Sequence, residues 1–472
     1  MKKTKVICTL GPSSSDHAVL EKMINAGMNI ARLNFSHGTY EEHGARIKLV
    51  RDVASSLGKP VGILADIRGP KIRTGILSEE PLILSDGSRI RLSIDQGKEQ
   101  TPGYIYVDYP SLLQDLHPGS KIFLADGMIE LQAVQIGSND VECEVTSGGE
   151  LTSRKGVTLP GVSVNLPALM DKDRRDIAFL VEQKIDFIAV SFARKAEHIV
   201  EIRKLLQDLG GDQLLIAKIE NEEGLHNVDE LIKVCDGIMV ARGDLGVEVP
   251  LEEVPLIQKY LIQRCNLAGK PVITATEMLE SMVRNPRPTR AEITDIAHAI
   301  TDGTDAIMLS AETAVGKYPV AAVEIMTRVA EKIEGSLKYH EILAKKRVNE
   351  SPTVADAISH ATCQTALDLS AKAIISSTHS GSTARMVSKY RPRVPILAAT
   401  PSERVANKLT ISWGVYPIVV SLYYDIDSML DVSVTAAKKS GLIQKDDLIV
   451  ITAGVKTGTP GSTNLLKVHN VE

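Results

Sequence analysis

Residues 215–244, LIAKIENEEGLHNVDELIKVCDGIMVARGD, decide the fold class of this chain. A short apolar run at 215–220 is followed by a helix-period stretch at 227–234 and by a second apolar run at 237–241. A strand, a helix and a strand in this order are typical of a parallel β/α unit. The segment therefore predicts an α/β protein with a parallel sheet.

The same alternation recurs along most of the chain. Eight β-branched runs alternate with amphipathic stretches, which fits a closed (β/α)8 TIM barrel better than an open sheet. The predicted strands are 6–9, 29–34, 61–66, 187–191, 215–220, 237–241, 272–276 and 306–310. The predicted helices are 16–26, 41–56, 172–183, 196–209, 227–234, 251–267, 290–301 and 320–333.

The alternation breaks once, from Gly69 to about Pro167. Short strand-like runs separated by Gly and Pro replace the helical period there, at 82–84, 89–93, 121–124, 129–134 and 141–145. This pattern predicts a small all-β domain inserted after the third strand. A polar stretch at 345–350 ends the barrel, and a second α/β unit follows it, with strands expected at 373–377, 396–399, 415–419, 448–452 and 465–469.

We therefore expect four segments. The TIM barrel occupies 1–69 and 167–337, an inserted β-barrel lid domain occupies 70–166, and a C-terminal α/β regulatory domain occupies 350–472. The way the chain ends after this last unit leads us to expect no additional phosphotransfer module.

Composition excludes several classes of protein. The net charge of −5, without a basic cluster, argues against nucleic-acid binding. The apolar run near the N-terminus is too short for a signal peptide, and no later run approaches the length of a membrane span. The 5 cysteines are scattered without a CxxC pair, which argues against a disulfide framework or zinc site and favours the cytoplasm.

Polar residues gather at the predicted C-terminal ends of the barrel strands, where TIM-barrel active sites lie. They are Arg32, Asn34, Ser36, Asp66, Lys218, Glu220, Arg242, Gly243, Asp244, Thr274, Thr276, Glu277, Ser310 and Glu312. Any one of them alone is more simply a strand-end group that meets water. Agreement among six strand ends instead predicts one shared site.

Glu220 and Asp244 offer the hard oxygen ligands that Mg²⁺ (or Mn²⁺) prefers. Lys218 adds a positive charge beside them, and an enolate or a phosphoryl group in transit needs such a pair of cations. A Lys–Glu surface pair is the alternative interpretation of Lys218 and Glu220.

Five segments resemble the signature sequences of pyruvate kinases. They are 28–37 (MNIARLNFSH), 218–224 (KIENEEG), 238–248 (IMVARGDLGVE), 272–292 (VITATEMLESMVRNPRPTRAE) and 308–319 (MLSAETAVGKYP). The resemblance covers nearly the whole chain. It implies transfer of the phosphoryl group of phosphoenolpyruvate to ADP, giving pyruvate and ATP in glycolysis, by a cytoplasmic homotetramer with a regulatory C-terminal domain.

The resemblance also implies roles for single residues. Arg32 would contact the substrate phosphate, Lys218 would stabilise the moving phosphoryl group and the enolate, and Glu220 and Asp244 would bind Mg²⁺. Thr276, with Ser310 and Glu312 behind it, would relay a proton to the enolate carbon. The substrate carboxylate would be held by Ala241, Arg242, Gly243, Asp244 and Thr276. ADP or ATP would contact Asn34, Phe35, Ser36, His37, Arg73 and Lys155.

Lys71 departs from the family pattern, because most pyruvate kinases carry a Glu there and need K⁺. The family K⁺ site corresponds to Asn34, Ser36, Asp66 and Ile67, of which the usual ligands Asn34, Ser36 and Asp66 are present. The aliphatic Ile67, together with Lys71, resembles the K⁺-independent branch of the family. We expect the fixed ammonium to replace the monovalent ion, so that K⁺ is not required; the alternative is that Lys71 points to solvent. Glu277 stands where many relatives have Gln. We expect this difference to change the pKa of groups near Thr276 only slightly.

A phosphate site is expected in the C-terminal domain. Thr378, Ser380, Gly381, Ser382 and Thr383 follow a predicted strand and open a helix, and such helix N-termini bind phosphate. In the family this place binds an allosteric effector. The few basic residues nearby favour a monophosphate, and a loop at 457–463 is expected to close over it. The alternative is an ordinary capped turn.

Two other functions compete with the kinase. One is a metal-dependent barrel lyase or aldolase acting on pyruvate enolate, which would need neither Lys155 nor Arg73. The other is an inactive scaffold or metabolite sensor on the same fold, which would have lost a central residue, whereas Lys218, Glu220, Asp244 and Thr276 are all present.

Overall fold

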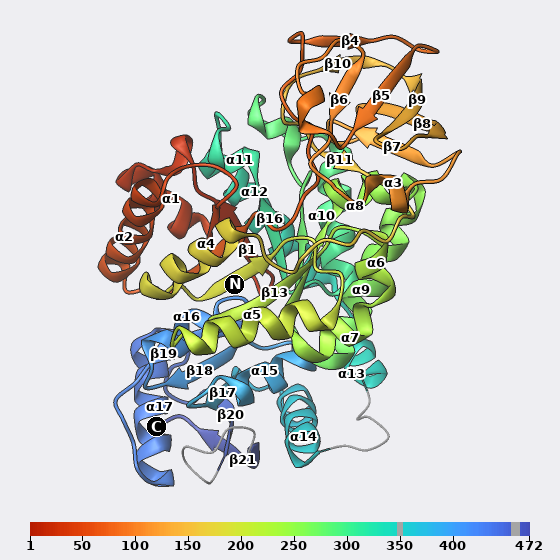
Figure 1. Cartoon of the computed structure of the whole chain (residues 1–472). Coiled ribbons are helices and arrows are strands. Elements are labelled where there is room, and N and C mark those ends of the chain that lie inside the picture. The colour runs from red at the N-terminus through yellow and green to blue at the C-terminus, as the bar shows by residue number, and fades with distance from the viewer. Residues whose placement is uncertain (347–352, 455–462) are drawn as a thin grey trace.

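A closed barrel of eight parallel strands forms the centre of the molecule (Figure 1). The computed structural model describes residues 1–346, 353–454 and 463–472. Around the barrel the strands follow the order β1-β16-β15-β14-β13-β12-β3-β2. Their bounds are β1 (Lys5–Thr9), β2 (Ile30–Asn34), β3 (Gly62–Ile67), β12 (Phe187–Val190), β13 (Leu214–Ile219), β14 (Gly237–Ala241), β15 (Val272–Ala275) and β16 (Ala306–Leu309). The eight predicted strands are confirmed, each end lying within about one residue of its expected position.

Period-two alternation divides each barrel strand between two cores. Ile30, Leu64 and Ile216 belong to the cluster that fills the barrel, whereas their neighbours Ala31 and Ala65 pack in the cluster beneath the helices. Both faces of the strands are therefore apolar, as in other parallel sheets. Two residues further along, the inward-facing positions become polar, because Arg32 follows Ile30, Asp66 follows Leu64 and Lys218 follows Ile216.

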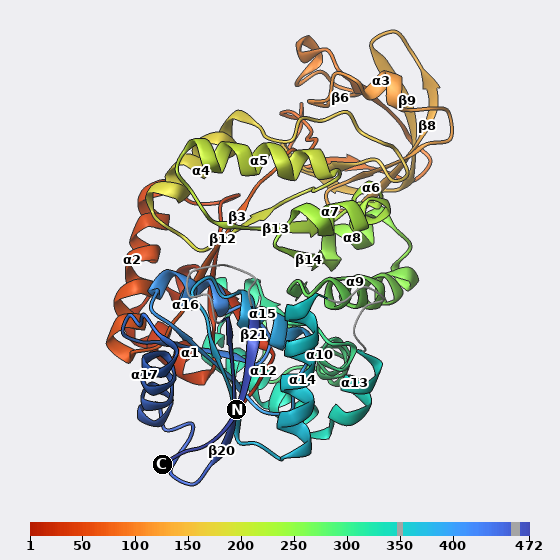
Figure 2. The same ribbon diagram turned by 90° about the horizontal axis from the view of Figure 1, so that it is seen from below.

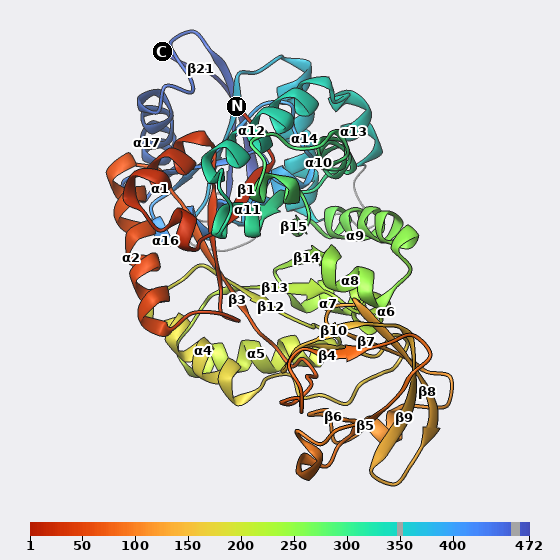
Figure 3. The same cartoon turned by 90° about the horizontal axis from the view of Figure 1, so that it is seen from above.

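Helices surround the barrel, as Figures 1 and 3 show. They are α1 (His17–Ala26), α2 (Tyr40–Leu57), α4 (Asp171–Glu182), α5 (Ala196–Asp208), α6 (Glu222–His226), α7 (Val228–Val234), α8 (Arg242–Glu248), α9 (Val254–Ala268), α10 (Arg290–Asp302), α11 (Ala311–Ala314) and α12 (Pro319–Ser336), with 3-10 turns η1 (Pro12–Ser14), η3 (Leu251–Glu253) and η4 (Glu280–Val283). The next helix, α13 (Tyr339–Lys345), leads into the C-terminal unit, whose core includes Leu343. The short helices α6, α8 and α11 were not predicted. They directly follow the strand ends that carry the polar residues.

The insertion is built from two sheets. A six-stranded sheet has the order β11-β7-β8-β9-β5-β6, and β10 pairs with β4. Their bounds are β4 (Leu82–Leu84), β5 (Arg89–Ser93), β6 (Tyr104–Tyr106), β7 (Lys121–Leu124), β8 (Ile129–Ile136), β9 (Asp140–Ser147), β10 (Gly149–Leu151) and β11 (Val157–Thr158), with η2 (Gln96–Lys98) and α3 (Leu112–Asp115). Isolated bridges Arg73–Gly156 and Thr74–Val107 connect the two edges of the six-stranded sheet through residues 73 and 74. The expected all-β segment also holds one short helix.

The C-terminal unit has a five-stranded sheet of order β19-β18-β17-β20-β21, in which only β21 is antiparallel to its neighbour. Its elements are α14 (Val354–Asp368), β17 (Ala373–Ser377), α15 (Ser382–Lys389), β18 (Ile396–Thr400), α16 (Glu403–Leu409), β19 (Val415–Val419), α17 (Ile426–Lys439), β20 (Leu448–Gly454) and β21 (Thr463–Asn470). All five predicted strands are confirmed. The expected closing loop lies outside the described residues except for Thr463, and so does most of the polar stretch at 345–350.

The C-terminal unit packs against the end of the barrel where the strands begin (Figure 2). Arg391 forms a buried ion pair with Asp305, which precedes β16, with Nη1–Oδ1 2.8 Å. Lys5, at the start of β1, donates to the carbonyl oxygen of Val415 at 2.5 Å. The insertion lies at the other end, and its Lys71 pairs with Asp244 at the start of α8. Within the described residues no helix is both long and apolar enough to cross a membrane.

Candidate active site

The Asp66 carboxylate joins two cations at the mouth of the barrel. Its Oδ2 accepts hydrogen bonds from Arg32 Nε (3.0 Å) and Nη2 (2.7 Å), and its Oδ1 lies 3.1 Å from Lys218 Nζ. Arg32 Nη1 also donates to Thr9 Oγ1 at 2.8 Å. All three charged residues are buried. Burial alone would raise the pKa of Asp66, but the Lys218 and Arg32 charges outweigh burial and lower it.

Lys218 also pairs with Glu220, its neighbour two positions along β13. Nζ lies 2.7 Å from Glu220 Oε1, and Glu220 Oε2 accepts the backbone N–H of Phe192 at 2.6 Å. Burial by itself would lower the pKa of Lys218, but Asp66 and Glu220 raise it above its usual value. The two carboxylates therefore favour the charged form of the ammonium. The pair is buried, which rules out the surface Lys–Glu interpretation.

Glu220 and Asp244 have the donor chemistry for a divalent metal ion. Burial raises the pKa of Glu220 most, Lys218 opposes this shift, and the Asp244 charge adds to it. A metal ion between the two carboxylates would remove this repulsion. Among the described residues no group of three or more His, Cys, Asp or Glu side chains could hold a metal alone. Water and substrate oxygens would therefore have to complete the coordination.

Lys71 reaches the same place from the insertion. Its Nζ lies 2.9 Å from Asp126 Oδ1 and 3.3 Å from Asp244 Oδ1, and 5.7 Å from the centre of the Phe192 ring. The side chain is only 18% exposed. Burial would lower the pKa of Lys71, but Asp244 and Asp126 raise it. Lys71 thus does not point to solvent, and it bridges the insertion to the candidate metal carboxylate.

Thr276 lies on a tight turn beside α8. Its Oγ1 accepts the backbone N–H of Gly243 at 2.9 Å and donates to the carbonyl oxygen of Ala275 at 2.7 Å. Thr276 and Glu277 both have positive φ, +66° and +56°. Non-glycine residues rarely adopt this conformation, and such strain is concentrated at functional sites. The Glu277 side chain is exposed.

Arg242 supports the Thr276 turn from behind. Its Nη1 pairs with Asp295 at 2.7 Å, and its Nη2 donates to the carbonyl oxygen of Thr276 at 2.5 Å. The guanidinium is thereby occupied with protein groups. The Gly243 N–H is likewise occupied by Thr276 Oγ1, and Ala241 and Asp244 lie beside it at the start of α8.

Glu312 holds the backbone at the end of β16 in place. Its Oε2 accepts the backbone N–H of Ser310 at 2.6 Å, and its Oε1 accepts that of Leu279 at 3.0 Å. Glu312 is 1% exposed. It therefore ties Ser310 to the segment that follows Thr276.

The residues expected to bind a nucleotide lie in two groups. Asn34 ends β2, and Ser36 and His37 lie on the turn that follows. The Asn34 side chain accepts the Ser36 N–H at 3.1 Å, and its carbonyl oxygen accepts the His37 N–H at 3.3 Å. The Phe35 side chain is buried and stacks on His43 with ring centres 4.0 Å apart, so it anchors this turn in the core. Ile67 is also buried.

Arg73 and Lys155 form the second group, on adjacent segments of the insertion. Arg73 Nη1 donates to the carbonyl oxygen of Arg154 at 3.0 Å, and Thr74 exchanges hydrogen bonds with the Lys155 backbone. The Lys155 side chain is exposed. The insertion therefore presents two cations on one edge.

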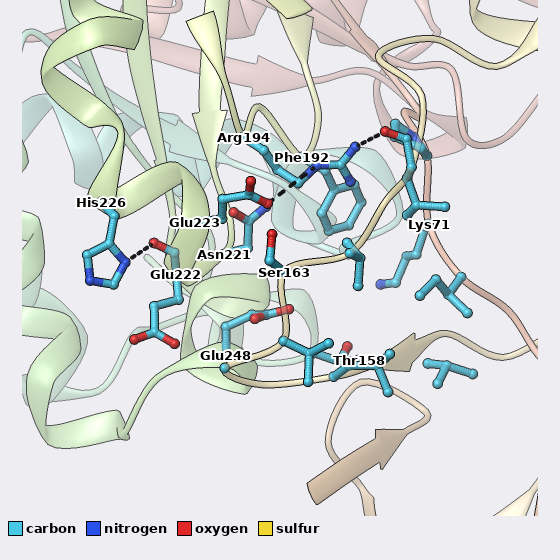
Figure 4. Close-up of a pocket in the computed structure, with 18 residues that line it drawn as sticks. Lys71, Thr158, Ser163, Phe192, Arg194, Asn221, Glu222, Glu223, His226 and Glu248 are labelled. Atoms are coloured by element: carbon cyan, nitrogen blue, oxygen red, sulfur yellow. Dashed lines mark hydrogen bonds and ion pairs between the residues drawn. The ribbon is translucent and has the colours of Figure 1, made fainter. Parts of the chain in front are cut away.

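A cavity of about 300 Å³ lies beside this site, between the insertion and the barrel (Figure 4). Residues 157–166 cover it, and Arg194 Nη2 fixes the end of this segment by donating to the Leu166 carbonyl oxygen at 2.7 Å. Glu222 and Glu248 line it from α6 and α8. Burial, and then the charges of Glu222 and Asp244, raise the pKa of Glu248 to about 8.

The expected effector residues lie at the start of α15, on the far side of the molecule from the insertion. Gly381 adopts φ +82° as the residue before the helix, and its N–H donates to Thr378 Oγ1 at 3.0 Å. Thr383 Oγ1 lies 2.9 Å from Thr463 Oγ1. Ser380 and Ser382 remain half-exposed. This geometry keeps both the phosphate-site and the capped-turn interpretations open.

Three residues of the site were missed from sequence. Ser191, Asp126 and Glu248 all contact or face the predicted residues. Ser191 ends a predicted strand and could have been included on that ground alone. Asp126 lies more than fifty positions from Lys71 in the insertion, so only the fold brings it close.

The Glu248 pKa gives a pH-dependent prediction. In the unfolded chain Glu248 ionises near 4.5, whereas the folded protein keeps it protonated up to about pH 8. The unfolded state therefore binds fewer protons across this window, and Glu248 costs stability progressively as pH rises through it. Replacing Glu248 with Gln should stabilise the metal-free protein by about 2 kcal/mol more at pH 8 than at pH 6.

Thermal unfolding of both proteins in EDTA at several pH values measures this difference. Glu252→Gln makes the same change of side chain at an exposed position and is the matched control. A Glu248→Gln profile that does not differ from that of the control would contradict the raised pKa.

Comparison with known proteins places the chain in a family. The model for the pyruvate kinase barrel domain matches residues 1–323, and the model for the pyruvate kinase alpha/beta domain matches 356–469. The pyruvate kinase of Geobacillus stearothermophilus is 51% identical over 471 residues, covering 99% of this chain and 80% of that protein. The pyruvate kinase of Clostridium acetobutylicum is 49% identical over 473 residues and is covered completely, as is this chain. The pyruvate kinase of Staphylococcus epidermidis is 48% identical over 100% of this chain and 81% of that protein. The chain therefore belongs to the pyruvate kinase family.

Proposed function

We propose that this chain transfers the phosphoryl group of phosphoenolpyruvate to ADP, giving pyruvate and ATP. The observation that carries the proposal is the buried set of Arg32, Lys218 and Asp66 beside the Glu220 and Asp244 carboxylates. A phosphoryl group in transit spreads negative charge over its oxygens, and catalysis of its transfer is mostly positioning and charge neutralisation. Membership in the pyruvate kinase family supports the same reaction.

The two cations would divide the work. Arg32 uses three of its five N–H groups on Asp66 and Thr9, which leaves two for phosphate oxygens. Lys218 would face the phosphoryl group and the enolate oxygen. A bound Mg²⁺ (or Mn²⁺), held by Glu220 and Asp244, would supply further charge neutralisation.

The enolate left by phosphoryl transfer needs a proton at carbon. Thr276 Oγ1 would supply or relay it, since it is already oriented by Gly243 N–H. Glu312, through the Ser310 and Leu279 backbone, holds the strand end beside it. The substrate carboxylate would lie against the N-terminal backbone of α8 near Gly243 and Asp244.

The insertion would act as a lid over the nucleotide. Asn34, Ser36 and His37 on the barrel and Arg73 and Lys155 on the insertion would contact ADP or ATP. Closure would bring the exposed Lys155 ammonium to the phosphates and exclude water. We further propose a cytoplasmic homotetramer, as is typical of the family; sedimentation of the purified chain measures the assembly.

The competing functions are disfavoured on specific grounds. A barrel lyase or aldolase acting on pyruvate enolate would have no use for Arg73 and Lys155 on an inserted domain. An inactive sensor would not need Lys218 and Asp66 held as a buried charged set, which costs desolvation energy.

The central test is a coupled assay of ATP formation from phosphoenolpyruvate, ADP and Mg²⁺. The wild-type chain should be active, and Lys218→Met should lower kcat by about 10³-fold, because one fixed charge on the moving group is lost. Lys338→Met removes an exposed lysine and is the control. Wild-type protein that forms no ATP, or Lys218→Met protein with normal kcat, would refute the proposal.

We also propose that Lys71 makes K⁺ unnecessary. Its ammonium, 3.3 Å from Asp244, supplies a fixed positive charge at the mouth of the site. Activity in tetramethylammonium buffer should therefore rise little on adding K⁺. Lys71→Glu should lose about 10²-fold in that buffer and recover when K⁺ is added.

Lys317→Glu, at an exposed position, controls for the added negative charge in general. Strong activation of the wild-type enzyme by K⁺ would contradict the assignment of Lys71.

We propose, finally, that the start of α15 binds a phosphorylated effector through Thr378, Ser380, Gly381, Ser382 and Thr383. Ribose 5-phosphate, AMP and fructose 1,6-bisphosphate should be titrated against phosphoenolpyruvate saturation. A monophosphate should lower the half-saturating phosphoenolpyruvate concentration. Ser382→Asp, which adds a like charge, should weaken effector binding by about 10-fold or more.

Ser85→Asp, on an exposed turn of the insertion, is the control. If none of the three compounds shifts the saturation curve, the turn is an ordinary helix cap.

A further inference from the structure

All three donors of the Lys218 ammonium are occupied. Nζ donates to Ser191 Oγ at 2.8 Å, lies 2.7 Å from Glu220 Oε1 and lies 3.1 Å from Asp66 Oδ1. An ammonium has three N–H groups and no acceptor, so these partners use its full capacity. For Lys218 to bind a substrate oxygen, one of the three partners has to give way.

The three partners differ in what else holds them. Asp66 is fixed by two hydrogen bonds from Arg32. Glu220 is held by one further hydrogen bond, from the Phe192 N–H to Oε2, and its Oε1 contacts Lys218. Glu220 is also a candidate ligand of a divalent ion, which would compete with the ammonium for Oε1. Glu220 is therefore the partner that can be withdrawn, and Asp66 and Ser191 are the partners that remain.

The Ser191 hydroxyl links the two partners that remain. It accepts from Lys218 and donates to Asp66 Oδ1 at 3.2 Å, so hydroxyl, carboxylate and ammonium form one closed set of contacts. Ser191 is 5% exposed, so water does not compete easily for these bonds. The hydroxyl is the only neutral group among the three partners, and it holds the ammonium without adding charge.

The backbone around Ser191 fixes the hydroxyl in place. Phe192 has φ +53°, and this turn directs its N–H to Glu220 Oε2. Gly69, where the insertion departs, packs so closely that a Cβ there would lie 2.7 Å from the Ser191 carbonyl oxygen. The backbone at Ser191 is therefore held on one side by the Phe192–Glu220 hydrogen bond and on the other by the close approach of Gly69.

We propose that Ser191 is a positioning residue for the reaction: its hydroxyl keeps the Lys218 ammonium in place when Glu220 turns to the metal ion, so that the freed N–H points to the phosphoryl group. Ser191 acts through Lys218 and does not touch the reacting atoms. The inference rests on the proposed kinase function.

The test compares Ser191→Ala with Ser191→Thr. Ser191→Ala removes the hydroxyl but leaves Asp66 and Glu220 to hold Lys218, so folding and metal binding should persist. Its kcat should fall about 10- to 100-fold, with the KM for ADP within about twofold of wild type, because orientation is lost rather than binding. Ser191→Thr keeps a hydroxyl and should recover kcat to within about threefold.

Two readouts separate positioning from a structural role. Mn²⁺ binding to the free protein, followed by electron paramagnetic resonance, should be unchanged in Ser191→Ala, as should its thermal unfolding. Ser163→Ala, which truncates an exposed serine of the cavity between the insertion and the barrel, is the matched control and should behave as wild type.

Each outcome decides the proposal. A normal kcat in Ser191→Ala would overturn it. A variant that loses Mn²⁺ affinity and thermal stability along with kcat would also overturn it, since Ser191 would then be structural. Suppose that both variants fold normally but Ser191→Thr does not recover kcat. That result would contradict the positioning role of the Ser191 hydroxyl. An inactive wild-type protein would instead reject the kinase function itself.

Discussion

One buried carboxylate, that of Asp66, makes the charged site possible. Arg32 and Lys218 lie at the ends of different strands, and without an anion between them two buried cations would repel each other. Removing one partner of such a set leaves an uncompensated buried charge, which is strongly destabilising. The closure of the barrel brings β2, β3 and β13 to one mouth, and the shared carboxylate then fixes both cations relative to the acidic pair beyond them.

The two ends of the barrel contact different parts of the chain. At the end where the strands finish, the insertion supplies Lys71 to the acidic pair. At the end where they begin, Asp305 is clamped by Arg391 from the C-terminal unit and also accepts the Val272 N–H that starts β15. The foot of β15 is thus tied to the C-terminal unit, while its other end leads into the strained Thr276 turn. This arrangement gives the C-terminal unit a direct mechanical connection to one strand of the site.

Much of this architecture could be read from the sequence. The barrel strands could be predicted because their alternation reflects local backbone geometry. The site could be located for the same reason, since the inward-facing positions of a strand change from apolar to polar, as from Ile216 to Lys218. The short strands β6, β10 and β11 were not predicted, since two or three residues carry little periodic signal, although the equally short β4 was predicted. The contacts of Ser191 and Asp126, and the burial of Phe35, depend on which distant segments meet, and no local pattern encodes that.

The insertion also bears on how the chain folds. β3 and β12 pair directly, with Leu64 opposite Phe187, although about 120 residues separate them. Closing so long a loop costs conformational entropy before any barrel contact rewards it, and such non-local pairing slows folding. An insertion with its own core shortens this loop once it has formed, because its two ends then leave as neighbouring segments. The insertion precedes β12 in the chain, so a domain that folds during synthesis would already hold the end of β3 close to the segment that leads into β12.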